Sequence, residues 1–183
     1  ESMLGDGMRM LMQRAFASRG VTLPAAVFNQ ACDDFLAAYK ATGYRDTKLY
    51  AGVTDTLHKL QADGWHIGLA SNKLTDPCES ILQRLGIRQL FSVVAGGDAT
   101  NVKKPDAGHL LYTLDQMGFQ SDSGDTAVMV GDHANDVDAA RAAGITAIAV
   151  AFEVDAARAH SLGADAVVTD FATLPAALTA ILR

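Results

Sequence analysis

The spacing of apolar residues predicts two helices in the first quarter of the chain. Between Gly7 and about Arg19, apolar side chains recur at helical intervals. A second apolar stripe follows Pro24 and ends at the turn Thr42–Gly43. No strand pattern separates the two stripes, so residues 1–46 are predicted to form a hairpin of two helices.

Beyond residue 46 the pattern changes to an alternation of helices and strands. Short apolar runs predict strands over 65–70, 91–95, 127–130, 146–150 and 166–168. Helical stripes between them predict helices over 53–62, 79–85 and 107–117, one that ends at 143 and one over 174–182. This alternation is typical of an α/β fold with a parallel, doubly wound sheet, which we assign to residues 47–183.

Composition and charge exclude several classes of function. The 183 residues carry a formal net charge of -6 and no basic run, which argues against nucleic acid and anionic membranes as partners. The sequence shows no signal-peptide pattern and no apolar stretch long enough to cross a bilayer, so we expect a cytoplasmic protein and no membrane partner. Cys32 and Cys78 lie far apart and are expected to be small buried or half-buried residues rather than reactive thiols.

Two spaced carboxylates follow the predicted strand 127–130. Gly131 permits a sharp turn, and Asp132 and Asp136 then lie at the carboxyl end of the strand, where open α/β sheets bind ligands. Magnesium takes one or two protein carboxylates together with phosphate oxygens, so this loop is a candidate Mg²⁺ site. Alternatively, Asp136 only caps a helix that stops at Gly144, and Asp132 is an ordinary turn residue.

Two further polar segments follow strands or precede helices in the same domain. Ser71 and Asn72 come directly after the strand 65–70, where a hydroxyl and free backbone N–H groups suit a phosphate oxygen. Lys104 precedes Pro105, which disfavours helical geometry and leaves the lysine extended and able to enter a cleft. The alternatives are a turn or cap at Ser71–Asn72 and a solvated lysine.

The order of these segments favours a common site. A hydroxyl, an ammonium and two carboxylates each lie at the carboxyl end of successive units of one sheet, so they are expected to converge. This set is typical of phosphoryl transfer, in which a protein positions the phosphate and neutralises its charge.

These motifs resemble those of the haloacid dehalogenase (HAD) superfamily, and within it the phosphoglycolate phosphatase-like group. Ser71 matches the residue that hydrogen-bonds the transferring phosphoryl group, and Lys104 matches the lysine that stabilises the nucleophile and the phosphate. Asp132 and Asp136 match the acidic pair that holds Mg²⁺.

The similarity extends over essentially the whole chain. Tyr50-Ala51-Gly52-Val53, with Leu57 and Leu60, is similar to the point at which the family's chain passes from its helical cap into the core. Gly163-Ala164-Asp165 followed by Val167-Val168 is similar to the family's usual ending. The resemblance therefore implies a HAD-like Rossmannoid parallel sheet with a partial helical cap.

The activity implied by the resemblance is Mg²⁺-dependent hydrolysis of a small phosphate monoester through an aspartyl-phosphate. In that mechanism Ser71 and the Asn72 N–H receive the phosphoryl oxygens, Lys104 neutralises charge, and the two aspartates hold the metal. The expected partner is a small phosphorylated metabolite, with phosphoglycolate as the default by resemblance only. A sugar-phosphate mutase of the same superfamily and a non-catalytic binding module are the alternatives, while a dehalogenase fits the Asp132 loop less well.

One departure from the family pattern concerns the nucleophile. The family's Asp-x-Asp-Gly-Thr motif, on a first core strand upstream of the cap, occurs nowhere in these 183 residues. Asp6 and Asp33–Asp34 do not follow apolar strands and are not assigned this role. We therefore expect the chain as given to be inactive. His66 is expected to be structural, and His133 could touch the substrate.

The same departure predicts a gap in the sheet. In the family the first core strand lies centrally, between the strands assigned to 67–70 and 127–130. A strand has about five or six residues, and each buried large apolar side chain contributes roughly 1.5–3 kcal/mol, so stability should be marginal. The chain is expected either to rearrange its sheet or to borrow a strand, by swapping or by forming a homodimer.

Overall fold

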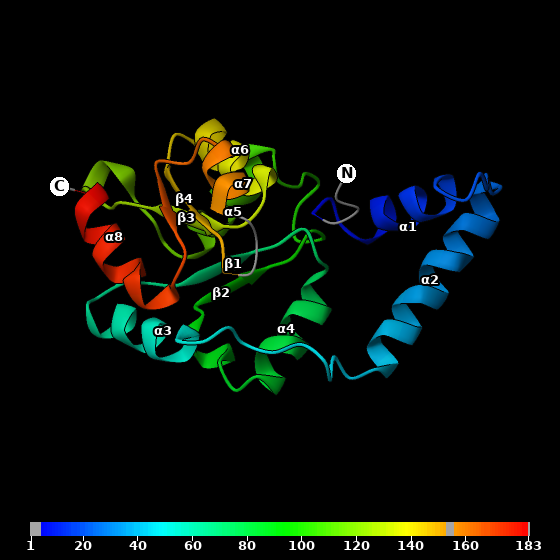
Figure 1. Cartoon of the computed structure of the whole chain (residues 1–183), viewed down its shortest axis with the longest axis horizontal. Coiled ribbons are helices and arrows are strands. Elements are labelled where there is room, and N and C mark those ends of the chain that lie inside the picture. The colour runs from blue at the N-terminus through cyan, green and yellow to red at the C-terminus, as the bar shows by residue number, and fades with distance from the viewer. Residues whose placement is uncertain (1–4, 153–155, 183) are drawn as a thin grey trace.

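The computed structural model describes residues 5–152 and 156–182. Its helices are α1 (Met8–Ala17), α2 (Ala25–Ala41), α3 (Val53–Ala62), α4 (Thr75–Arg84), α5 (Ala107–Gln116), α6 (Ala134–Ala143), α7 (Ala156–Ser161) and α8 (Leu174–Ile181). Its strands are β1 (Gly68–Ala70), β2 (Val93–Ala95), β3 (Val128–Gly131), β4 (Thr146–Val150) and β5 (Ala166–Val168). Figure 1 shows the helix pair α1 and α2 extending from one end of an α/β core.

The strands form two separate parallel sheets. In one, β1 pairs with β2, with Gly68 opposite Val93. In the other, β4 lies between β3 and β5. Within the described ranges no strand pairs with the second edge of β1 or with that of β3. The parallel α/β class is as predicted, and the break falls where the gap was expected. Because β1 and β3 do not pair, rearrangement has not closed the sheet, and the borrowing of a strand stays a prediction.

Element boundaries differ from the predictions mainly around β1 and α4. The strand predicted over 65–70 is observed only at Gly68–Ala70, the three residues that pair with Val93–Ala95 of β2. Helix α4 begins at Thr75, four residues before the predicted start at Glu79. Pro77 lies in its first turn, where a missing N–H breaks no helical hydrogen bond, so the proline does not delay the helix. Helix α7 was not predicted.

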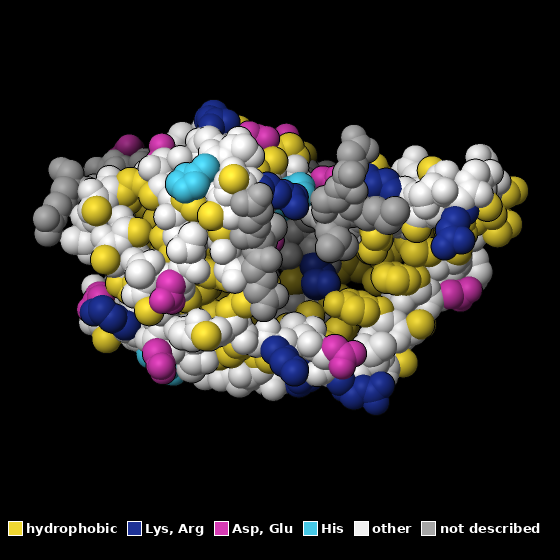
Figure 2. Space-filling model, in the orientation of Figure 1, with side chains coloured by type: hydrophobic (Ala, Val, Ile, Leu, Met, Phe, Trp, Pro, Cys, Tyr) yellow, Lys and Arg dark blue, Asp and Glu magenta, His cyan; other side chains and the backbone are white. Residues whose placement is uncertain are grey.

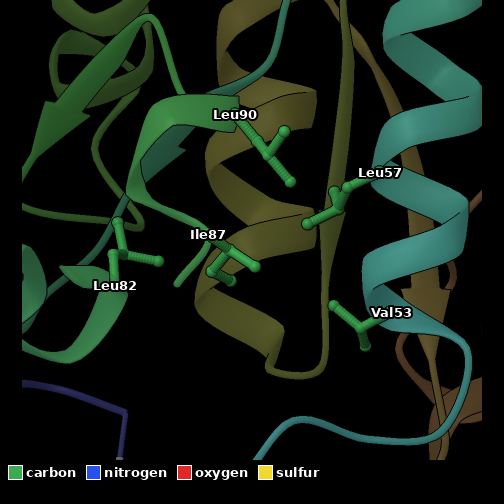
Figure 3. Close-up of a cluster of buried hydrophobic side chains, with 5 residues drawn as sticks. All are labelled: Val53, Leu57, Leu82, Ile87 and Leu90. Atoms are coloured by element: carbon green, nitrogen blue, oxygen red, sulfur yellow. The ribbon is translucent and has the colours of Figure 1, made fainter. Parts of the chain in front are cut away.

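Four groups of buried hydrophobic side chains form the described core, and the smallest of them joins Ala149, Ala151 and Ala159. The other three pack helices against strands or against each other. Figure 3 shows the first, in which Val53 and Leu57 of α3 lie near Leu82 of α4 and near Ile87 and Leu90, which follow α4. Its members are Val53, Leu57, Leu82, Ile87 and Leu90. The second packs α3 and α8 on the larger sheet, and its members are Leu60, Ile148, Val168, Leu174 and Leu178. The third packs α5 and α6 on the opposite face, with Leu110, Val137, Ala139, Ala140 and Ala147.

The helix pair has a much thinner core of its own. Phe16 of α1 and Phe28 of α2 meet edge to face, with ring centroids 6.3 Å apart. Cys32 is the one residue of α2 that is buried, and no residue of α1 is. None of the helices in the described ranges is long and apolar enough to cross a membrane.

Candidate active site

A pocket of about 590 Å³ lies at the carboxyl ends of β1 and β3. Its walls come from the loops after these strands and from the apolar side of the helix pair, and Figure 2 shows the hollow between the two parts. All the site residues predicted from the sequence line it, namely Ser71, Asn72, Lys104, Asp132 and Asp136. The helix pair adds Met8, Leu11, Phe35, Leu36 and Tyr39.

Lys104 and Asp136 form a buried ion pair at the base of the pocket. The Lys104 Nζ lies 2.7 Å from Asp136 Oδ1, and the two side chains are only 7% and 10% exposed. The same ammonium donates to the carbonyl of Ala70, at 2.5 Å. Since an ammonium has three N–H donors, one is left for a ligand in the pocket. The lysine is therefore not the solvated side chain of the alternative interpretation.

Asp136 also fixes the start of α6. Its Oδ2 accepts a hydrogen bond from the His133 N–H at 3.1 Å, while the His133 ring accepts one from the Asn135 N–H. His133 is therefore the N-cap residue and Asp136 completes a capping box at the third position. Gly131 makes room for this carboxylate, because a Cβ at that position would lie 2.3 Å from Asp136 Oδ2. Asp136 thus has a capping role and also faces the pocket.

Asn72 joins three separate segments through its side chain. Its amide donates to the carbonyls of Gly5, at 2.8 Å, and of Lys104, at 2.9 Å. Its Oδ1 accepts from the Lys104 N–H at 3.1 Å. The side chain is thereby occupied, and the backbone N–H is the group left for a phosphate oxygen. Ser71 Oγ accepts from the Lys73 N–H at 3.1 Å, as in the predicted turn, and its own proton can still be donated.

The other residues considered in the sequence analysis differ in exposure and in whether they line the pocket. Asp132 is exposed and makes no hydrogen bond or ion pair within 5–152 and 156–182. His66 is exposed ahead of β1 and does not line the pocket, whereas His133 does. Cys32 and Cys78 are free and buried, as predicted, and burial raises the pKa of the Cys78 thiol.

The acidic pair fits a hard divalent cation. The part of the chain that the structure describes contains no group of three or more His, Cys, Asp or Glu side chains placed to hold a metal ion by themselves. Magnesium needs only one or two protein carboxylates, with water or phosphate supplying the other ligands. Asp132 offers an unpaired carboxylate, and Gly131 lets the Asp136 carboxylate lie against the strand end. The donor set suits Mg²⁺ better than a softer metal that prefers Cys or His.

A contact that sequence reasoning missed ties the helix pair to the core. The Gly5 carbonyl accepts hydrogen bonds from Asn72 and, at 3.2 Å, from Asn135. Asn135 also donates to Asp6 at 2.6 Å, and Arg14 forms an ion pair with the same carboxylate. The hydrogen bond from Asn135 lowers the pKa of Asp6. Asn135 lies 130 positions from Gly5 and 129 from Asp6, and Asn72 lies 67 from Gly5, so no local pattern could have paired them.

Two other groups near the pocket were not predicted. The Lys73 Nζ lies 3.1 Å from the Tyr39 hydroxyl and 4.8 Å from its ring centroid, a second tie between α2 and the core. His109 of α5 is fully buried, and neither ring nitrogen makes a hydrogen bond of normal geometry to the described residues. Burial lowers the pKa of His109, and the Lys104 ammonium acts in the same direction.

The fold and the pocket together define a Rossmann-like α/β protein with a helical cap over the carboxyl ends of its strands. Residues 1–150 match the family model described as haloacid dehalogenase-like hydrolase. The chain belongs to this family, which confirms the resemblance stated from the sequence and makes it a HAD-like hydrolase by family.

Named relatives agree with this assignment. The chain is 34% identical over 178 residues to a phosphoglycolate phosphatase of Agrobacterium fabrum, covering 96% of this chain and 74% of the relative. It is 36% identical to a phosphoglycolate phosphatase of Chromobacterium violaceum, covering 95% and 77%. A crystal structure from Haemophilus somnus 129pt, described as a predicted phosphoglycolate phosphatase, superposes with a TM-score of 0.83 at 26% identity, covering 96% and 79%.

Proposed function

We propose that this pocket is the phosphate-binding and magnesium-binding part of a phosphoglycolate phosphatase-like active site. The observation that carries the proposal is the Lys104 ammonium, held between Asp136 and the Ala70 carbonyl in a pocket that Ser71 and Asp132 also line. The Lys104 ammonium has one N–H left to donate, and it lies in the same pocket as the free Asp132 carboxylate and the Ser71 hydroxyl. Together these groups could bind a phosphate dianion and a metal ion.

Each residue has a defined task in this proposal. Asp132 and Asp136 would hold Mg²⁺, which when bound would neutralise phosphate charge and polarise a phosphoryl oxygen. The Ser71 hydroxyl and the Asn72 N–H would donate to the phosphoryl oxygens, and Lys104 would neutralise charge at the same centre. Asn72 holds the Lys104 segment in register through two hydrogen bonds.

Under the same proposal the 183-residue chain by itself hydrolyses phosphate monoesters slowly or not at all. Hydrolysis through an aspartyl-phosphate needs a free carboxylate as nucleophile. Asp6 is engaged by Asn135 and Arg14, and Asp136 by Lys104 and His133. Asp132, the free carboxylate of the pocket, is assigned to the metal. We therefore propose that these residues bind phosphate and Mg²⁺ without completing the reaction.

The substrate class follows from the size and lining of the pocket. A volume of about 590 Å³ suits a small molecule, and the polar groups gather at the strand ends while the helix pair contributes mostly apolar side chains. A small phosphorylated metabolite fits this division. The relatives named as phosphoglycolate phosphatases support phosphoglycolate as the first substrate to test. We also propose a cytoplasmic location, with no nucleic acid or membrane as partner, in keeping with the acidic net charge.

Titration calorimetry with Mg²⁺ and inorganic phosphate tests this proposal without requiring turnover. We expect phosphate to bind more tightly when Mg²⁺ is present, and we expect Ser71→Ala and Asp132→Asn each to weaken that binding by about tenfold or more. Ser123→Ala and Asp122→Asn, which change exposed residues outside the pocket, should bind like the parent chain. Equal binding by all four variants would exclude the pocket as the phosphate site, and substantial Mg²⁺-dependent turnover would exclude the inactive state.

A further inference from the structure

Lys73 is a second cation of the pocket, and it has no acidic partner among the described residues. Like Lys104, it lines the pocket at the carboxyl end of β1. None of the ion pairs formed between described residues includes Lys73, whereas Lys104 is paired with Asp136. The pocket therefore has one ammonium whose charge is already balanced by a carboxylate and another whose charge a bound anion could balance.

Both ends of Lys73 are held in place. Its backbone N–H donates to Ser71 Oγ at 3.1 Å, and its carbonyl accepts from the Gly97 N–H at 2.7 Å. At the other end, Nζ lies 3.1 Å from the Tyr39 hydroxyl and 4.8 Å from the centroid of its ring. The side chain is exposed, but these contacts keep its ammonium against the helix pair rather than free in solvent.

Tyr39 is itself fixed by two other aromatic rings. It stacks on Phe35, with centroids 6.0 Å apart, and meets Tyr44 edge to face at 4.9 Å. Of the described helix-pair residues that line the pocket, Tyr39 alone has a polar group in its side chain. Because its hydroxyl oxygen accepts from Lys73, the hydroxyl proton can be donated to a ligand.

Lys73 and Tyr39 together offer three hydrogen-bond donors. An ammonium has three N–H groups, and only one of those on Lys73 is used by Tyr39, so two remain beside the phenolic O–H. The polar side chains at the start of α6 are less available. Asn135 already donates to the segment before α1, and Gly5 packs on the His133 ring so closely that a Cβ there would lie 2.6 Å from Nε2.

We propose that Lys73 and Tyr39 form a carboxylate-binding subsite, which makes the pocket select phosphate monoesters of short carboxylic acids over neutral ones. A carboxylate accepts several hydrogen bonds and balances the ammonium charge, whereas the apolar side chains of the helix pair offer no such partner. The inference deepens the proposed function and rests on it, because the ligand's phosphate is taken to bind at Ser71 and Lys104.

The spacing of the two groups favours a small ligand. Ser71 and Lys73 are two positions apart, so their Cα atoms are separated by at most about 7 Å. The hydrogen bond from the Lys73 N–H to Ser71 Oγ keeps the serine hydroxyl beside the lysine backbone. A ligand with only a few atoms between its phosphate and its carboxylate could therefore contact both residues.

Two ligands that differ only in the carboxylate test the proposal. Ethyl phosphate has the phosphate ester of phosphoglycolate but a methyl group in place of the carboxylate. In titration calorimetry of the 183-residue chain with Mg²⁺, we expect phosphoglycolate to bind at least about tenfold more tightly than ethyl phosphate. Lys73→Met should abolish this preference and change the binding of ethyl phosphate by less than about twofold.

Two further variants separate recognition of the carboxylate from the tie between α2 and the core. Tyr39→Phe removes the hydroxyl that joins Lys73 to α2 but keeps the ring and the ammonium charge. It should weaken phosphoglycolate alone, by about threefold. Lys40→Met removes the same charge one position from Tyr39 but outside the pocket, and it should leave the preference unchanged.

Several results would overturn the subsite. These are equal binding of the two ligands by the parent chain, a preference that persists in Lys73→Met, and tighter binding of ethyl phosphate. Equal weakening of both ligands by Lys73→Met would show that the lysine only ties the helix pair to the core. In each case phosphate binding, and with it the proposed function, would stand. Absence of binding by phosphoglycolate, ethyl phosphate and inorganic phosphate alike would exclude both proposals.

Discussion

The pocket at the strand ends and a second cavity of about 650 Å³ between β1 and β3, which we call the inter-sheet slot, share four lining residues but differ in their charge and in the pairing of their backbone groups. In the pocket, buried polar groups such as Lys104 and Asp136 each have partners. In the slot, mostly apolar side chains surround the facing edges of β1 and β3, neither of which pairs with a second strand among the described residues. The loops around the pocket therefore satisfy their buried polar groups, whereas the facing edges of β1 and β3 have no strand partner among the described residues.

The largest expected effect comes from breaking the pocket's buried ion pair. Lys104→Met would leave the Asp136 carboxylate buried without its partner, and the expected loss of unfolding free energy is about 3–5 kcal/mol. Urea unfolding followed by circular dichroism measures it. The control is Lys59→Met, which removes an exposed pair with Asp63 and should cost less than about 0.5 kcal/mol. Similar losses for both variants would contradict the importance of burial.

The next largest effect is the loss of unfolding free energy when a buried side chain is truncated far from the slot or beside it. Ile148 of β4 is 1% exposed, and Ile148→Ala should cost about 2–5 kcal/mol. Leu57 borders the slot, so part of its surface already lacks contacts, and Leu57→Ala should cost about 1–2 kcal/mol. Urea midpoints of the two variants test the order. A larger cost at Leu57 would show that the slot is closed in solution.

A smaller effect concerns His109, which lies near Lys104. The pKa of His109 is lowered in the folded chain, so as the pH falls the unfolded chain binds a proton at this histidine before the folded chain does. The free energy of unfolding is therefore unaffected by His109 well above the unfolded pKa of 6.5 and declines as the pH falls below that value. The slope for one proton is at most about 1.4 kcal/mol per pH unit. His109→Leu should flatten the change in melting temperature between about pH 6.5 and 5. The exposed His58→Gln should not, and equal slopes for all three proteins would refute the assignment.

The smallest effect is at the tie between the helix pair and the core. Asp6→Asn weakens contacts with Asn135 and Arg14 and should cost about 0.2–1 kcal/mol at neutral pH. Because the pKa of Asp6 is lowered, this contribution is present above the unfolded value of 3.8 and is lost as the pH falls through the folded value. Differential scanning calorimetry at neutral and acid pH measures the difference. Asp33→Asn, on the exposed side of α2, is the control, and a difference that persists in acid would contradict this account.

Local patterns of apolar residues were enough to predict the bounds of several buried helices and strands. The predicted bounds of α3, β4 and β5 coincide with the observed ones, because β4 has partners on both edges and α3 carries a complete apolar stripe. The strand at β1 was predicted too long, since the sequence shows which residues are apolar but not how many of them pair with β2. Helix α7 has no apolar stripe of helical length, and six residues are too few to reveal one.

The residues of the candidate site could be predicted from the sequence, but the hydrogen bonds that join its segments could not. Ser71, Lys104 and Asp136 stand out because they follow strands or precede helices at one edge of a parallel sheet. The structural use of Asn72, and the contacts of Gly5 with Asn72 and Asn135, could not be predicted. They join positions far apart in the chain, and such pairing depends on how the helix pair sits over the core.

Asn72 makes separate hydrogen bonds to the segment that precedes α1 and to the Lys104 segment of the core. Swinging the helix pair away from the core would break its hydrogen bond to Gly5 but none of its bonds to Lys104. A ligand could therefore enter or leave while the charged groups beneath stay in register. Separating the two parts would cost the hydrogen bonds of Gly5 with Asn72 and Asn135, while the two hydrogen bonds between Asn72 and Lys104 would stay in place.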